Sequence, residues 1–163
     1  MTANIVTAER VRELLDYNPS SGIFTRRVSR KRWKSGSAPG CLDRQGYHRI
    51  WIDGIRYNSH RLAWLYVHGR WPTDQLDHIN GRRDDNRLSN LREATHAHNQ
   101  QNQRKAQKNN QSGFLGVRFQ SNRWHAYIKV SNKQTYLGSF PAAELAHEAY
   151  VTAKRKLHPA CTI

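Results

Sequence analysis

The stretch QLDHINGRRDDNRLSNLREATHAHNQQNQ, residues 75–103, decides the predicted fold. A short extended piece around Asp77 and His78 leads into a run of Asn, Gly, Arg and Asp that is typical of turns and loops. Residues 90–94 can return as a second short strand, and Thr95 can cap a helix over residues 96–105. The stretch therefore predicts strand, loop, strand and helix in succession.

This order would bring Asp77, His78 and Asn99 to one place. Carboxylate and amide oxygens are hard donors that suit Mg²⁺ or Mn²⁺. A neutral imidazole, whose pKa is ordinarily about 6.5, can take a proton from water at neutral pH. The set can therefore hold one hard cation and one base, and Asn90 could pin the loop through backbone hydrogen bonds and so aim the imidazole.

Residues 76–102, LDHINGRRDDNRLSNLREATHAHNQQN, resemble the ββα-metal motif of HNH endonucleases, specifically the phage and intron-associated homing type. The resemblance implies that Asp77 and Asn99 bind one Mg²⁺ or Mn²⁺ ion, that His78 is the general base and that Asn90 is the central Asn. Many HNH enzymes have His where this chain has Asn99. Nearby His96 and His98 leave the third assignment open.

The composition favours a nucleic-acid partner. The chain of 163 residues has a formal net charge of +15 and a pI near 10.5, which indicates binding to a polyanion. No apolar run approaches the roughly 20 residues of a membrane-spanning helix. Cys41 and Cys161 form no CxxC pair, and the first residues lack the apolar region of a secretion signal, so we expect a cytoplasmic protein of a phage or its bacterial host.

An HNH endonuclease domain is predicted over residues 1–105, and it includes an N-terminal sheet that contacts DNA. The pattern predicts a helix over residues 8–17, a strand over 23–26, a hairpin over 46–57 that turns at Asp53-Gly54, and a helix of about ten residues capped by Ser59. Three histidines are expected to be structural or surface residues, because none has metal-like spacing: His48, His60 and His68.

A basic segment lies within this first domain and contains no acid. A solvated loop is one interpretation. Trp33 and the missing acids favour contact with the DNA backbone. The residues expected to make it are Arg26, Arg27, Arg30, Lys31, Arg32 and Lys34.

A second module is predicted after a polar linker over residues 106–112, which is too poor in apolar residues to bury a core. Residues 113–163 read as three antiparallel strands, with turns at 121–122 and 131–132, followed by a helix from Pro141 to about Leu157. Apolar residues at helical spacing, among them Leu145, are expected to lie under the strand residues Val117, Phe119, Trp124, Ala126, Ile128, Leu137 and Phe140.

Alternation assigns a basic and aromatic set to the other sheet face: Arg118, Gln120, Arg123, His125, Tyr127, Lys129 and Tyr136. An ordinary solvated face would mix charges of both signs, so we expect DNA contact. Residues 112–140, SGFLGVRFQSNRWHAYIKVSNKQTYLGSF, resemble the AP2 DNA-binding domain. The resemblance implies that Arg118, Gln120, Arg123, Tyr127, Lys129 and Tyr136 face DNA, but Tyr127 and Tyr136 depart from the plant pattern, so base preference does not carry over.

The sequence thus predicts an α+β protein that acts as a metal-dependent, site-directed endonuclease on double-stranded DNA. One active site per chain makes a nick by a monomer the default, and a homodimer or two successive events would be needed to break both strands. A catalytically inactive AP2-type regulator is the alternative. An RNA-binding or packaging protein that relies on bulk charge would show no metal dependence and poor sequence discrimination.

Overall fold

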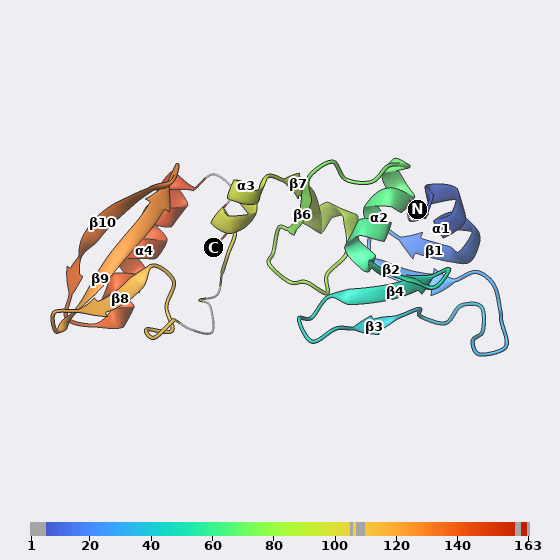
Figure 1. Ribbon diagram of the computed structural model, residues 1–163, viewed down its shortest axis with the longest axis horizontal. Helices are drawn as coiled ribbons and strands as arrows, with labels where there is room; N and C mark the ends of the chain where they lie inside the picture. The colour runs from blue at the N-terminus through green and yellow to red at the C-terminus, as the bar shows by residue number, and fades with distance from the viewer. Residues whose placement is uncertain (1–5, 105, 107–109, 159–160, 163) are drawn as a thin grey trace. The chain divides into compact units, whose positions relative to one another are not determined.

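The computed structural model describes residues 6–104, 106, 110–158 and 161–162. The chain forms two compact units, Met1–Thr95 and His96–Ile163, and the mixture of helices with small antiparallel sheets confirms the α+β class (Figure 1). Residues 107–109 of the predicted linker lie outside the described residues. The domain limits predicted from the sequence therefore stay predictions.

The first unit opens with a helix and a hairpin: α1 (Ala8–Leu14), β1 (Leu15–Asn18) and β2 (Ile23–Arg26). The helix predicted to reach Tyr17 is wrong at its end, because Leu15 pairs with Arg26 and Tyr17 with Phe24 across an antiparallel ladder. Strand geometry buries alternate residues here, with Leu15 and Tyr17 in the core.

A meander and a helix follow: β3 (Cys41–Leu42), β4 (His48–Ile52), β5 (Ile55–Asn58) and α2 (Ser59–His68). The predicted turn at Asp53-Gly54 is confirmed, with φ of 47° and 82° at the two residues. The predicted cap is wrong by one residue, since Asn58 is the N-cap and Ser59 is the first helical residue. The core of the unit joins residues of α1, the hairpin, β4 and α2, including Val11, Leu15, Ile50, Leu62 and Leu65.

Two short strands complete the first unit: β6 (Gln75–His78) and β7 (Leu91–Ala94), preceded by the 3-10 turn η1 (Leu88–Asn90). They pair antiparallel, so that Asp77 lies opposite Arg92 and His78 opposite Leu91. The predicted strand, loop and strand of the central stretch are confirmed. The loop of residues 79–90 between them is called the site loop below.

The second unit contains α3 (His96–Gln101), a sheet of β8 (Val117–Gln120), β9 (Arg123–Val130) and β10 (Lys133–Phe140), and α4 (Ala143–Leu157). The sheet order is β10-β9-β8, all antiparallel, and α4 covers one face of it (Figure 1). Helix α3 ends earlier than predicted, and α4 begins two residues after Pro141.

The contact between α4 and its sheet depends on small side chains. Ala126 and Ala146 are fully buried, and Val117 lies beside them. Two predicted core residues are wrong: Phe119 is 55% exposed and Leu145 is 46% exposed. Phe119 is close to the turn that ends the edge strand β8, where its ring packs on Trp124 at 4.7 Å and not under the helix.

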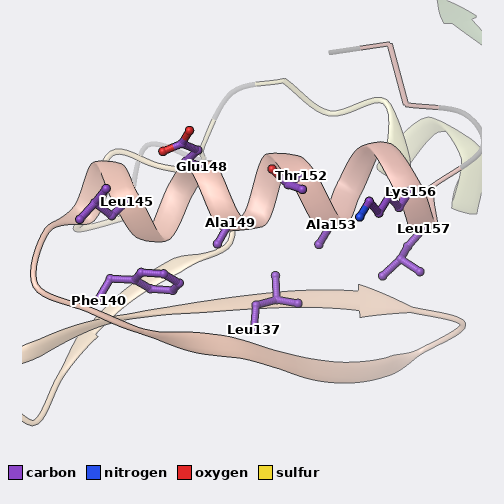
Figure 2. A pocket seen from close by; sticks show the side chains of 9 residues that line it. All are labelled: Leu137, Phe140, Leu145, Glu148, Ala149, Thr152, Ala153, Lys156 and Leu157. Carbon is purple, nitrogen blue, oxygen red and sulfur yellow. The ribbon is translucent and has the colours of Figure 1, made fainter.

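A shallow groove runs along α4 beside β10 and is lined mainly by apolar side chains, among them Leu137, Phe140 and Leu157 (Figure 2). None of the residues predicted to bind DNA or metal lines it. Within the described ranges, no helix has the length and apolarity to cross a membrane.

Candidate active site

Asp77 lies on β6 with its side chain buried. Arg92, directly opposite on β7, donates to the carboxylate Oδ2 from Nε at 3.1 Å and from Nη2 at 2.9 Å. Sequence reasoning missed Arg92. The predicted pairing of the two strands could have revealed it, because the register places residue 92 across from residue 77 on the same face of the ladder.

His78, the next residue of β6, is only 5% exposed. Its Nε2 lies 3.1 Å from Oδ1 of Asn86 in the site loop. Burial lowers the pKa of His78, while the hydrogen bond to Asn86 and the charges of Asp77, Asp84 and Asp85 act in the opposite direction. The imidazole is therefore neutral at pH 7 and able to accept a proton.

His60 of α2 was expected to be a structural or surface residue, and the structure buries it beside His78. Its ring packs edge-on against that of His78, with centroids 4.9 Å apart, and Tyr47 lies within 6.2 Å of His78. Burial, and then the charge of His78, lowers the pKa of His60 to about 3. Two neutral imidazoles thus share one aromatic cluster. Sequence spacing gave no sign of it, because the rings meet through tertiary packing.

Asn90 holds the site loop from within. Its Oδ1 accepts from the Asn80 N–H at 2.9 Å, and its Nδ2 donates to Asn80 Oδ1 at 3.0 Å and to the Asp85 carbonyl at 2.8 Å. Asp85 in turn binds Asn80 and Arg87, and the Arg87 bond is the main reason that the pKa of Asp85 falls to about 2. The loop contacts expected of Asn90 are present; its catalytic role stays a prediction.

The β1–β2 hairpin supports the same loop from outside. The Tyr17 hydroxyl donates to the Asn86 carbonyl at 2.7 Å, and the Leu88 N–H donates to the Pro19 carbonyl at 3.1 Å. At the hairpin turn, Gly22 has φ of 74°, and a Cβ there would lie 2.3 Å from the Arg87 nitrogen. Only glycine fits this close approach.

Asn99 and the alternatives His96 and His98 lie on α3, in the other compact unit. Asn99 is half-buried, whereas both histidines are exposed. Among the described residues, no group of three or more His, Cys, Asp or Glu side chains could hold a metal ion. The predicted pair of one carboxylate and one amide is a different donor set, and its assignment stays a prediction.

Two arginines of the basic segment bind other groups of the protein. Arg26 donates to the Ala38 carbonyl at 2.7 Å and stacks over Trp33 at 4.8 Å, and Arg27 donates to the Arg12 carbonyl at 2.8 Å and pairs with Asp16 at 3.4 Å. The protein itself thus holds these two side chains, and their contact with DNA stays a prediction. The others are exposed: Arg30, Lys31, Arg32 and Lys34.

The predicted DNA-contacting sheet of this unit carries an exposed aromatic residue that sequence reasoning did not select. Trp51 of β4 is 61% exposed, with the guanidinium of Arg56 on β5 at 5.8 Å from its ring. The two residues pair across the strands. This face is therefore both basic and aromatic.

The outer face of the second unit's sheet has the membership expected from alternation, because Arg118 pairs with His125, Gln120 with Arg123, and Tyr127 with Tyr136. The Tyr127 and Tyr136 rings lie 5.4 Å apart, and Arg118 lies 5.7 Å from the ring of Tyr127. Lys129 is exposed on the same face. DNA contact by this face stays a prediction.

Comparison with known proteins finds a family match in the middle of the chain. Residues 57–101 match the model of the HNH endonuclease family. No curated protein sequence is significantly similar to the chain. A solved structure described as "DNA binding and cleavage by the HNH homing endonuclease I-HmuI" is similar to this chain, with 21% sequence identity and a TM-score of 0.44. The match covers 88% of this chain and 80% of the other chain.

Proposed function

We propose that the chain is a DNA-cleaving nuclease, and specifically a metal-dependent, site-directed endonuclease of the homing type. The match of residues 57–101 to the HNH endonuclease family supports this proposal. One observation carries the proposal: β6 presents adjacent, buried Asp77 and His78 beside a loop that Asn90 ties together. A solvated loop would need no such network, whereas an aimed base does.

His78 acts as the general base. Its neutral imidazole takes a proton from water as the water oxygen bonds to phosphorus and the bond from phosphorus to the 3′ oxygen breaks. The leaving oxygen is protonated from solvent, so the products carry 5′-phosphate and 3′-hydroxyl ends. Burial supports this role, because it lowers the pKa of His78 and keeps the ring neutral at pH 7.

Asp77 and Asn99 are proposed to hold one Mg²⁺ or Mn²⁺ ion, and their oxygen donors fit hard cations. Arg92 donates to Asp77 Oδ2 from both Nε and Nη2, so the guanidinium fixes this carboxylate in position. A divalent ion bound there would stabilise negative charge on the phosphorane and on the leaving oxygen.

Double-stranded DNA is the proposed substrate. The exposed basic residues of the first unit supply phosphate contacts, and the aromatic and basic outer face of β8–β10 supplies a second surface, as the AP2 resemblance implies. The protein acts as a monomer that nicks one strand, and a homodimer would cut both.

The proposal is tested by cleavage of supercoiled DNA with Mg²⁺. His78→Ala should lose activity by about 10²–10⁴-fold, as expected on removing a general base. His68→Ala is the matched control, because His68 is an exposed histidine at the end of α2. Equal activity of His78→Ala and wild type would reject His78 as the base.

The third site residue is tested separately. Asn99→Ala should abolish Mg²⁺-dependent cleavage while DNA binding is largely kept, because the residue would be a ligand that carries no charge. Asn99→His should retain activity and tolerate Ni²⁺ or Zn²⁺. Loss of activity in His98→Ala but not in Asn99→Ala would assign the position to His98.

A further inference from the structure

We propose that Asn86 is a positioning residue that holds His78 in the Nε2–H tautomer, so that Nδ1 is the nitrogen that accepts the proton from water. The inference rests on the proposed role of His78 as base. Asn86 itself touches neither substrate nor metal in this proposal, and it acts only through the imidazole.

The first argument is the direct contact. Asn86 is 3% exposed, and its Oδ1 lies 3.1 Å from Nε2 of the equally buried His78. An amide oxygen only accepts hydrogen bonds, so Nε2 must carry the proton for the contact to be favourable. The other tautomer would place two lone pairs face to face in a buried site, where unmade hydrogen bonds are costly.

The second argument is that Asn86 is itself held in place. The Tyr17 hydroxyl binds its backbone carbonyl at 2.7 Å, and the Gly22 turn lies against the peptide that joins Asn86 to Arg87. Asn90 fixes the same loop one residue earlier, at the Asp85 carbonyl. The acceptor therefore belongs to a braced backbone and has little freedom to move away from the ring.

The third argument concerns the ring plane. His60 packs edge-on at 4.9 Å from the His78 centroid, and the Tyr47 ring lies at 6.2 Å. These rings restrict rotation of the imidazole about its Cβ–Cγ bond, and the Asn86 bond selects which of the two opposite ring orientations is occupied. The base is then fixed in both tautomer and direction.

Proton transfer strengthens the contact. When Nδ1 accepts a proton from water, the ring becomes an imidazolium whose Nε2–H still donates to the Asn86 oxygen. Hydrogen bonds from a charged donor are stronger than neutral ones. Asn86 thus stabilises the protonated form that develops during attack, which a residue that only fills space would not do.

Histidine ¹⁵N spectroscopy of the full-length protein tests the tautomer without requiring catalysis. The protein has nine histidines, and His78→Gln identifies the resonances of His78. In neutral solution the wild type should show a protonated Nε2 with slow hydrogen exchange and an unprotonated Nδ1. Asn86→Leu should lose the slow exchange and show mixed tautomers, whereas Asn86→Asp should keep the wild-type pattern.

Cleavage kinetics form the second arm. Asn86→Leu should lower kcat by roughly 10–100-fold, as outer partners of catalytic groups typically do, with KM for DNA unchanged within about twofold. Asn86→Asp should recover most of the loss, because it keeps the acceptor oxygen, and its comparison with wild type remains decisive if the Leu variant fails to fold. Ser89→Ala, an exposed change in the same loop, should cleave like wild type.

A wild-type His78 protonated at Nδ1, or an Asn86→Asp variant without the Nε2 signature, would overturn the inference. Unchanged tautomer and kcat in a folded Asn86→Leu variant would also overturn it. Failure of the proposed function is distinguishable, because active His78→Ala would remove His78 as base while leaving the spectroscopic result in place.

Discussion

The site loop, residues 79–90, and the basic loop, residues 27–40, are both rich in arginine but differ in what their side chains contact. In the site loop Asn80, Asp85 and Asn90 bind one another, and Asn86 is buried. In the basic loop every residue from 27 to 36 is exposed. The two loops differ because the site loop has Asn and Asp residues among its arginines, whereas the basic loop has none.

The comparison teaches that polarity alone does not indicate a solvated loop. A loop with both donors and acceptors can satisfy its polar groups internally and hold a catalytic side chain. A loop with cations and no carboxylates leaves charge facing solvent, where phosphates can replace water. The two loops are thus suited to aiming a base and to holding a polyanion.

Among the changes that test this comparison, the largest effect is expected from removing the side chain that closes the site loop. Asn90→Ala removes the acceptor and donor that close the loop on Asn80 and Asp85. We expect a cleavage loss of about 10²-fold or more, because even a 1 Å misplacement of a catalytic group is costly. Supercoiled-DNA cleavage and DNA affinity would be measured together. Retention of full activity would show that the network does not aim His78.

Substitutions at two glycines can distinguish the cost of steric crowding from the cost of backbone strain. Gly22 and Gly36 have similar φ, 74° and 79°, but only at Gly22 would a Cβ meet neighbouring backbone. Gly36→Ala should cost about 1–2 kcal/mol from the left-handed conformation alone. Gly22→Ala should cost about 2–5 kcal/mol, since crowding adds to the strain. Urea unfolding measures both, and equal costs would contradict a supporting role for the hairpin.

The buried histidine beside the site predicts a pH dependence of stability. His60 has a folded-state pKa of about 3, below its unfolded value of 6.5, so the unfolded state binds more protons between these values. Its contribution is present above pH 6.5 and is lost as the pH falls toward 3.

His60→Phe should reduce the fall in unfolding free energy between pH 7 and pH 5 by about 2 kcal/mol. His68→Phe, at an exposed site, should leave the profile of urea unfolding unchanged. A His60→Phe profile parallel to that of the wild type would contradict the low pKa.

The smallest expected effect is in the basic loop. Arg32→Gln should weaken DNA binding a few-fold and reduce the dependence of log K on log salt concentration by about 0.9, the value for one lost phosphate contact. Arg27→Gln is the matched control, because Arg27 already pairs with Asp16. It should lower stability slightly and change the salt slope less. Identical slopes for both variants would show that the ion pair of Arg27 with Asp16 does not reduce its contact with DNA.

The local parts of the fold could be predicted from the sequence. Asp53-Gly54, Ser121-Asn122 and Ser131-Asn132 all adopt positive φ at both residues, because such residues tolerate the mirror-image turns that close two-residue hairpins. The Asp77 and His78 strand could also be placed, since its pairing partner follows after a single loop. These predictions depend on residues close in the chain.

Other features could not be predicted, because their causes are distant in sequence. Leu15 to Tyr17 continue a helical pattern but form a strand, since pairing with residues 23–26 outweighs local preference. Asn86 looks like any other polar loop residue until His78 and Tyr17 are placed around it. His60 fits an amphipathic helix equally well whether or not another histidine lies against it.

The bond between Tyr17 and the Asn86 carbonyl joins residues 69 positions apart, and this has a consequence for folding. Closing so long a loop costs chain entropy, so we expect this contact to form after the local hairpins. During synthesis the hairpin emerges first and its partner loop much later. A partly folded chain therefore has the charge to associate with nucleic acid before it has an aimed base, and competence to cut is gained among the last steps.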